Sequence, residues 1–223
     1  MPAISVLTPI AVSIALRPTL HIGYTSCRPP QISYSGSMIR YGFACKTVGV
    51  PQADLTAITL ARATHENMRN VCRHNLRALE TMLRYCAEAH IPLMRISSDI
   101  IPLASHPQNS FDWQRELHEE LASVRATLAQ TGIRVSMHPG QYTVLNSPRQ
   151  DVVDRAVDDL TFHAGFLDAL GADGSAHIIL HLGGGYGDRA SALERLTDNL
   201  LALPPQVLSR ISLENDERVF NIE

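Results

Sequence analysis

The segment AHIILHLGGG, residues 176–185, gives the clearest indication of the fold. It is a short and strongly apolar run, which predicts a buried strand. The segment before it, residues 150–170, has apolar side chains at steps of three and four and is closed by Gly171, which predicts a helix. The segment after it has leucines at helical spacing and is stopped by Pro204 and Pro205. The apolar strand therefore lies between two predicted helices.

The same alternation extends toward both ends of the chain. Further strands are predicted at residues 38–45, 91–98, 133–139 and 210–216. Further helices are predicted at residues 67–90 and 112–130, the second with Asp112 as its N-cap and Gly132 at its stop. Strict alternation predicts an α/β fold in which helices cover a parallel sheet, either an open doubly wound sheet or a (β/α) barrel.

Side chains that commonly bind metal ions recur where the predicted strands end. His138, His181 and Glu214 end three successive strands, and His106 follows the strand before them. In a barrel, the C-terminal ends of the strands and the loops after them converge on one face. A single histidine at a strand end is more often a structural residue, so the repetition carries the inference. The pattern predicts one metal site built from these four side chains.

A short loop follows His138 and contains Gln141 and Tyr142 after Gly140. An amide can hydrogen-bond to a base edge and an aromatic ring can stack on a base, so the pair would suit a probe of nucleobases. A loop glutamine beside a packing tyrosine is the alternative. The glycines of residues 183–187 either offer N–H groups to a phosphate or form a plain tight turn. The sequence contains neither G-x-G-x-x-G after a strand nor G-x-x-x-x-G-K-[ST], so nucleotide binding by those devices is not supported.

The composition is that of a globular protein, with 45% apolar residues, 18% charged residues and a net charge of -3. This balance excludes a disordered tail, and no uncharged apolar stretch reaches the ~18 residues of a membrane span. Four cysteines in 223 residues do not make a disulfide scaffold. Residues 1–37 contain no Asp or Glu, and we expect an extension before a domain that starts at Met38. A poorly formed secretory signal or a transit segment is the alternative for that extension.

The chain resembles the UV damage endonuclease family across residues 38–223. The matching motifs occur in order and are specific in combination. They are M-I-R-Y-G-F-A-C (38–45), N-L-R-A-L-E (75–80), R-I-S-S (95–98), I-P-L-A-S-H-P (101–107), S-M-H-P-G-Q-Y (136–142), H-L-G-G-G-Y-G-D (181–188) and L-E-N-D-E-R (213–218).

The resemblance implies a TIM barrel related to the apurinic endonuclease and xylose isomerase group. It implies cleavage of the phosphodiester bond immediately 5′ of a UV photoproduct, and of some other lesions, in damaged double-stranded DNA. It also implies a cluster of divalent ions, manganese first and zinc or magnesium as alternatives. The residues that match catalytic metal ligands are His106, His138, His181 and Glu214.

Three further residues match positions that meet the DNA in this family. Gln141 and Tyr142 match residues that wedge into the duplex and probe the strand opposite the damage, and Phe43 matches an aromatic position that lines the site. An enzyme of this kind is expected to be a cytoplasmic monomer that acts on damaged duplex DNA and has no membrane partner.

The match ends at Glu223, after the fifth predicted strand, whereas the family has later strands that carry further ligands. Because a (β/α)₈ barrel typically has ~250 residues, we expect residues 38–223 to be the N-terminal part of a barrel with about five of its eight strands. An open sheet edge would make such a chain poorly soluble or inactive by itself. Two other functions stay open: a metal-dependent sugar isomerase or epimerase on the same barrel, and an inactive remnant.

Overall fold

The computed structural model describes residues 40–216 and 218–221. The predicted N-terminal extension, residues 1–37, lies outside the described residues, as do the first two residues of the first predicted strand. The elements in chain order are β1 (Gly42–Ala44), a 3₁₀ helix (Leu60–Arg62), α1 (His65–Glu88), β2 (Leu93–Ile96), a 3₁₀ helix (Ser98–Ile100), α2 (Trp113–Glu116), α3 (His118–Thr131), β3 (Arg134–Met137), α4 (Gln150–Ala169), β4 (Ile178–His181), α5 (Arg189–Leu201), α6 (Pro205–Leu208) and β5 (Ile211–Glu214).

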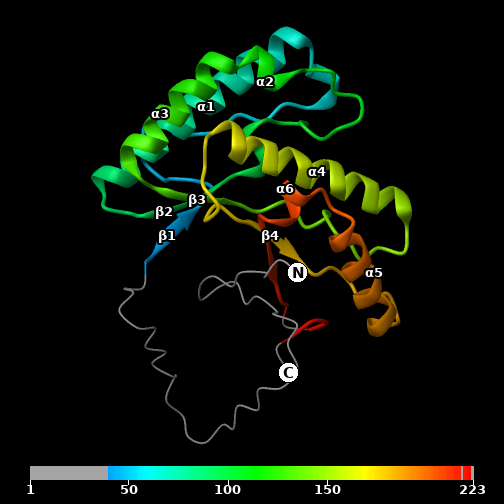
Figure 1. Ribbon diagram of the computed structural model, residues 1–223. Coiled ribbons are helices and arrows are strands. Elements are labelled where there is room, and N and C mark those ends of the chain that lie inside the picture. Colours follow the sequence, from blue (N-terminus) through cyan, green and yellow to red (C-terminus); the bar gives the residue numbers. More distant parts are fainter. Residues whose placement is uncertain (1–39, 217, 222–223) are drawn as a thin grey trace, which may run out of the picture.

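The five strands form one sheet whose spatial order, β1-β2-β3-β4-β5, follows the order in the chain. Every neighbouring pair is parallel. A doubly wound sheet reverses its strand order at a switch point, whereas right-handed crossovers that always advance in one direction place all helices on one side. Figure 1 shows α1, α3, α4 and α5 on the outer side of the strands. The arrangement is therefore of the barrel type, and the doubly wound alternative is excluded.

The core lies between the helices and the outer face of the sheet. Alternate residues of β2 and β3 are buried there, among them Met94, Ile96, Val135 and Met137, each at most 2% exposed. They pack against apolar side chains of the covering helices, such as Leu79 of α1, in one continuous cluster. Burying one side chain of this size stabilises the fold by roughly 1.5–3 kcal/mol. The sheet is thus held in place by the helical layer behind it.

Most predicted helix boundaries agree with the structure to within a few residues. Asp112 caps α2, because its Oδ1 accepts a hydrogen bond from the N–H of Arg115 at 3.2 Å. Gly132 ends α3 in a left-handed conformation with φ of 63°. The first long helix begins at His65 instead of Asn67, since the Thr64 hydroxyl accepts a hydrogen bond from the N–H of Asn67.

The prediction of one continuous helix over residues 112–130 is wrong. The helix breaks at Leu117, whose backbone φ of -120° and ψ of 21° are not helical. Leu117 is completely buried, and its carbonyl oxygen accepts the N–H of Leu121, which starts α3. The change of direction therefore brings this leucine into the core. After α5 the two prolines stop the helix as predicted, but Pro205 also begins the short helix α6.

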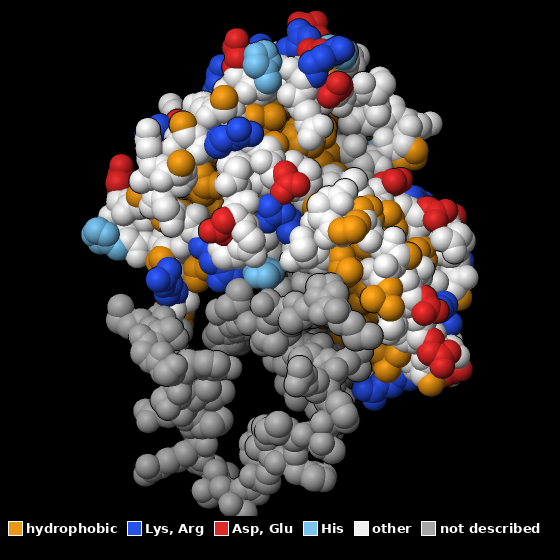
Figure 2. All heavy atoms as spheres, viewed as in Figure 1, with side chains coloured by type: hydrophobic (Ala, Val, Ile, Leu, Met, Phe, Trp, Pro, Cys, Tyr) orange, Lys and Arg blue, Asp and Glu red, His pale blue; other side chains and the backbone are white. Residues whose placement is uncertain are grey.

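Charged side chains of both signs are interspersed over the helical layer on the face shown in Figure 2. Some of them connect neighbouring helices. Glu80 of α1 accepts hydrogen bonds from Arg84 of the same helix and from Ser123 and Thr127 of α3. Among the helices of the described residues, none combines the length and apolar character that a membrane span requires.

Candidate functional site

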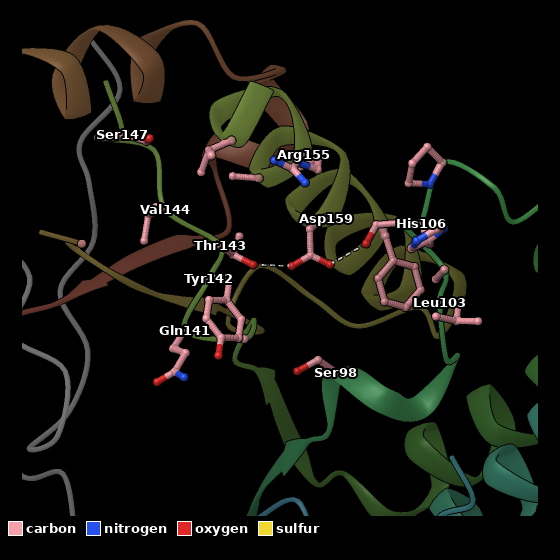
Figure 3. A pocket seen from close by; sticks show the side chains of 18 of the residues that line it. Ser98, Leu103, His106, Gln141, Tyr142, Thr143, Val144, Ser147, Arg155 and Asp159 are labelled. Atoms are coloured by element: carbon pink, nitrogen blue, oxygen red, sulfur yellow. Dashed lines mark hydrogen bonds between the residues drawn. The ribbon is translucent and has the colours of Figure 1, made fainter. Parts of the chain in front are cut away.

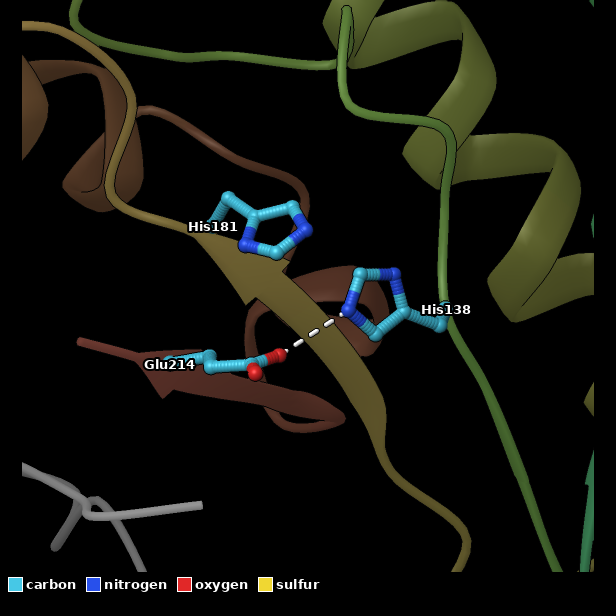
Figure 4. Close-up of side chains that lie close together, drawn as sticks. All are labelled: His138, His181 and Glu214. Atoms are coloured by element: carbon cyan, nitrogen blue, oxygen red, sulfur yellow. Dashed lines mark hydrogen bonds and ion pairs between the residues drawn. The ribbon is translucent and has the colours of Figure 1, made fainter. Parts of the chain in front are cut away.

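Three of the predicted metal ligands meet at the C-terminal ends of the strands. The imidazoles of His138 and His181 and the carboxylate of Glu214 each offer a ligand atom within 4.8 Å of the others. The two imidazole rings meet edge to face with centroids 4.6 Å apart, and His138 Nε2 lies 2.9 Å from Glu214 Oε2. Figure 4 shows the three side chains pointing toward one another. We refer to His138, His181 and Glu214 as the strand-end group.

Strand geometry explains this convergence. Each member follows a residue that packs into the core behind the sheet; these residues are Met137, Leu180 and Leu213. Because successive side chains of a strand point to opposite faces, the next residue points away from the helices. His181 and Glu214 are also register partners of neighbouring strands. The sheet therefore places all three side chains on its inner face at one end.

The protonation of His138 bears on whether the strand-end group fits a metal ion. Its Nδ1 lies 2.8 Å from the carbonyl oxygen of Pro139, so Nδ1 carries the hydrogen and donates it. In a neutral ring, Nε2 then has a lone pair that faces an oxygen of Glu214. Two acceptors at this distance repel each other unless a proton or a cation lies between them.

A divalent cation is well suited to that position. Two imidazoles and a carboxylate are a usual donor set for Zn²⁺, Mn²⁺ and Fe²⁺. The hydrogen bond from Nδ1 to a backbone carbonyl is the outer-shell contact that orients ligating histidines. His138 is 14% exposed and Glu214 is 23% exposed, so the group is sheltered but can be reached by solvent. The residues of the strand-end group therefore fit a metal ion.

A cleft of about 1050 Å³ lies between the loops after β2, β3 and β4 and the helix α4, and its lining includes Gly140 and Gly183, each two residues after a histidine of the strand-end group. Gln141 and Tyr142 line it from the loop after β3, and both are exposed, Tyr142 at 83%. The N–H of Thr143 donates to the carbonyl oxygen of Gly140 at 2.9 Å, which closes a four-residue turn. We call residues 140–143 the probe turn. Gln141 and Tyr142 are its two central residues, so their side chains project from its tip (Figure 3).

His106 is not part of the strand-end group. It lines the cleft from the loop after β2, ten residues beyond the end of that strand at Ile96. Its Nδ1 accepts a hydrogen bond from the N–H of Gln108 at 3.2 Å. The structure therefore brings together three of the four predicted ligands, and His106 faces the cleft from a neighbouring loop (Figure 3). Its role as a ligand stays a prediction.

Phe43 lies on β1, in register with Met94 of β2. It is half-buried and packs against the core, and it is not among the residues that line the cleft. Its predicted contact with DNA stays a prediction.

The glycine-rich loop after β4 is shaped by Asn146. Gly183 has φ of +80°, and a Cβ atom there would lie 2.2 Å from Oδ1 of Asn146. Asn146 is completely buried, and its Nδ2 donates to the carbonyl oxygen of Gly184 at 2.8 Å. Gly183 therefore permits a close approach that a side chain would prevent. The loop is a tight turn that the buried Asn146 side chain holds by its hydrogen bond to Gly184, and it forms one wall of the cleft.

Two buried histidines lie outside the group. His163 of α4 is completely buried, and burial lowers the pKa of its imidazole, although the nearby carboxylate of Asp159 opposes this shift. His177 directly precedes β4 and so lies at the opposite end of that strand from His181. Burial and the charge of Arg134 lower the pKa of His177. Both rings are favoured in the neutral form, which suits packing.

The sheet order and the three candidate ligands at its strand ends define an α/β protein of the (β/α)-barrel class with a candidate metal centre. The family model described as UV-endonuclease UvdE matches residues 37–223. The chain therefore belongs to the UV-endonuclease UvdE family, and the resemblance noted in the sequence is confirmed.

The relatives agree with this assignment. The UV DNA damage endonuclease of Clostridium perfringens (strain 13 / Type A) is 37% identical over 185 residues, which are 83% of this chain and 45% of that protein. The UV DNA damage endonuclease of Bacillus cereus (strain Q1) is 36% identical over 155 residues, 70% of this chain and 49% of that protein. The crystal structure of SacUVDE superposes with a TM-score of 0.78 at 33% identity, covering 82% of this chain and 63% of that one. The predicted barrel-type fold is thus confirmed, and the chain spans about half the length of the curated relatives it matches.

Proposed function

We propose that this chain functions in metal-dependent nicking of damaged double-stranded DNA, at the phosphodiester bond immediately 5′ of UV photoproducts and some other lesions. The observation that carries the proposal is the strand-end group, since its donor atoms fit a divalent ion at the face where barrel enzymes act. Manganese is the proposed metal, with zinc or magnesium as alternatives. We expect a monomer that acts in the cytoplasm.

Each member of the site has a defined task in this proposal. His138 is held by Pro139 with Nε2 directed toward Glu214, and His138, His181 and Glu214 would form the first set of ligands. His106 is proposed to bind a further ion from the cleft. A divalent ion held by these side chains would supply an activated water and charge neutralisation at a phosphate. Neither Ser nor Cys is needed as a nucleophile.

Recognition of damage is assigned to the probe turn. Its tip presents an amide and an aromatic ring to the cleft, and these groups can read and stack on bases that a lesion has already loosened. Extruding such bases costs a few kcal/mol at most and least where pairing is disturbed. Selectivity for damage would follow from that lower cost. Phe43 is proposed to contact the same DNA.

The test uses the 223-residue chain with 5′-labelled duplex oligonucleotides, irradiated or not, with and without Mn²⁺. Because the chain covers about half of its relatives, selective binding is the first measurement and nicking is the second. We expect tighter binding to the irradiated duplex, and any nick to lie 5′ of the lesion, to need Mn²⁺ and to be lost in Glu214→Gln. Equal affinity for both duplexes without a nick would refute the proposal.

A further inference from the structure

Asp159 of α4 connects two loops that come from distant parts of the chain. Its Oδ1 accepts a hydrogen bond from the Ser105 hydroxyl at 2.9 Å, and its Oδ2 accepts one from the Thr143 hydroxyl at 2.7 Å (Figure 3). Ser105 directly precedes His106, and Thr143 directly follows Tyr142. One carboxylate thus joins the loop that carries His106 to the probe turn.

Thr143 is the residue through which the probe turn is fixed. Its N–H closes the turn onto Gly140, and Thr143 is only 8% exposed, whereas Tyr142 beside it is 83% exposed. A hydroxyl-to-carboxylate distance of 2.7 Å is within the usual range for hydrogen bonds to a charged acceptor, which are the stronger kind. The base of the turn is therefore anchored and its tip is free.

The loop before His106 depends on the same carboxylate. Leu103 has φ of 59°, a left-handed conformation that a branched side chain rarely adopts. Its carbonyl oxygen accepts hydrogen bonds from the N–H of His106 and from Nδ2 of Asn109, so these bonds close the bend within the loop. The hydroxyl of Ser105 connects that bend to α4.

Asp159 itself is well supported. Its side chain is 21% exposed, and its backbone carbonyl oxygen accepts a hydrogen bond from Nδ1 of the buried His163 at 2.7 Å. The adjacent Asp158 is exposed and makes no side-chain hydrogen bond to the other residues that the structure describes. The two neighbours have the same chemistry but different surroundings, which makes Asp158 a matched control.

We propose that Asp159 is a positioning residue that sets where His106 and the Gln141–Tyr142 pair lie relative to each other. The strand-end group does not depend on it, since strand register and a hydrogen bond from the Ser98 hydroxyl to the carbonyl oxygen of His138 hold that end of β3. The effect of Asp159 on DNA binding rests on the function proposed above. We call the hydrogen bonds from Ser105 and Thr143 to Asp159 the tether, and the tether can be measured without that function.

The first measurement is amide hydrogen exchange of the full chain in Asp159→Ala, Asp159→Asn and the control Asp158→Ala. We expect exchange in residues 103–109 and 140–147 to rise about tenfold or more in Asp159→Ala, because each loop loses a hydrogen bond to a charged group. Asparagine keeps the size and can still pair with both hydroxyls, so Asp159→Asn should restore protection to within about threefold of the wild type. Asp158→Ala should match the wild type.

The second measurement follows binding to an irradiated duplex that carries 2-aminopurine opposite the lesion, together with Mn²⁺ affinity. We expect Asp159→Ala to weaken duplex binding about fivefold or more and to reduce the fluorescence change, because loss of one base stack has at least that effect. Mn²⁺ affinity of the strand-end group should stay within about threefold, which a general loss of folding would not allow.

Two results would overturn the tether: unchanged exchange in both loops of Asp159→Ala, or an equal rise throughout the chain. If Asp159→Ala does not fold, Thr143→Val keeps the shape and removes one hydroxyl, and faster exchange confined to residues 140–147 is expected; unchanged exchange there would overturn the proposal. If the wild-type chain does not prefer irradiated DNA, the proposed function fails while the exchange result still decides the tether.

Discussion

The strand-end group and the cleft-facing residues are positioned by different physical means. His138, His181 and Glu214 are placed by the strands, so the core behind the sheet fixes them. His106, Gln141 and Tyr142 are on loops, and side-chain hydrogen bonds to one helix hold those loops. The fold can thus keep the strand-end group rigid while the cleft-facing residues are adjusted separately. We therefore expect substitutions in the core to disturb the strand-end group, and substitutions at the hydrogen bonds to α4 to disturb the loops.

The largest effect should come from the packing that supports the strands. Leu79 of α1 is completely buried in the core, so Leu79→Ala should lower the free energy of unfolding by about 2–5 kcal/mol. Urea denaturation followed by circular dichroism measures this. Leu201, 72% exposed on α5, is the control, and Leu201→Ala should change stability by no more than about 0.5 kcal/mol. Similar losses in both variants would contradict a core that supports the sheet.

The next largest effect concerns metal affinity, which should differ between variants of His138 and of His106. His138→Ala removes a member of the strand-end group, and we expect its affinity for Mn²⁺ to fall about 100-fold or more, at least the loss seen when an outer-shell partner is removed. Titration of free Mn²⁺ by electron paramagnetic resonance measures it. The matched substitution His106→Ala should leave this affinity within about threefold, because His106 lies outside the group.

The same titration can show whether His106 and the strand-end group are separate metal sites. If His106→Ala weakens the first Mn²⁺ ion as much as His138→Ala does, His106 reaches the strand-end group in the metal-bound protein and the two regions form one centre. If only a second and weaker ion is lost, His106 holds a separate ion of the cluster, as proposed.

How far the sequence predicts this site follows from the same distinction. Strand ends can be predicted because apolar strands alternate regularly with helices, so the sequence predicts that His138, His181 and Glu214 lie together. The structure places one ligand atom of each within 4.8 Å of the others. The position of His106 depends on a hydrogen bond between Ser105 and Asp159, which lie 54 residues apart, and no local pattern encodes it. Nothing in the helix periodicity distinguishes Asp159 from the exposed Asp158.

The sequence does not predict the break at Leu117, for a related reason. The apolar stripe of residues 112–130 continues across it, and only the packing of the finished core shows that this leucine is buried by a change of direction. Local periodicity therefore predicts that a helical segment exists but not whether it is continuous. The packing of the buried Leu117 in the core determines where the segment breaks.

The smallest predicted effect concerns the buried histidines, which differ from those of the site. Burial holds the pKa of His163 below its usual value near 6.5, so the unfolded chain takes up a proton as the pH falls through that value while the folded protein does not. Stability contributed by neutral His163 is therefore present above pH ~6.5 and is lost as the pH falls toward the folded-state pKa. The slope is at most about 1.4 kcal/mol per pH unit for one group.

Urea denaturation between pH 7 and pH 5.5 tests this, since protonation of the carboxylates belongs to lower pH. His163→Asn can keep the hydrogen bond to the Asp159 carbonyl oxygen and removes the titration, so it should flatten the dependence of unfolding free energy on pH whatever its effect on absolute stability. His177, whose pKa burial also lowers, should leave a residual slope. His118, with its side chain 74% exposed, is the control, and His118→Asn should keep the wild-type slope. An unchanged slope in His163→Asn would mean that the ring gains a proton as easily in the fold as in the unfolded chain, and that Asp159, its nearest carboxylate, outweighs burial.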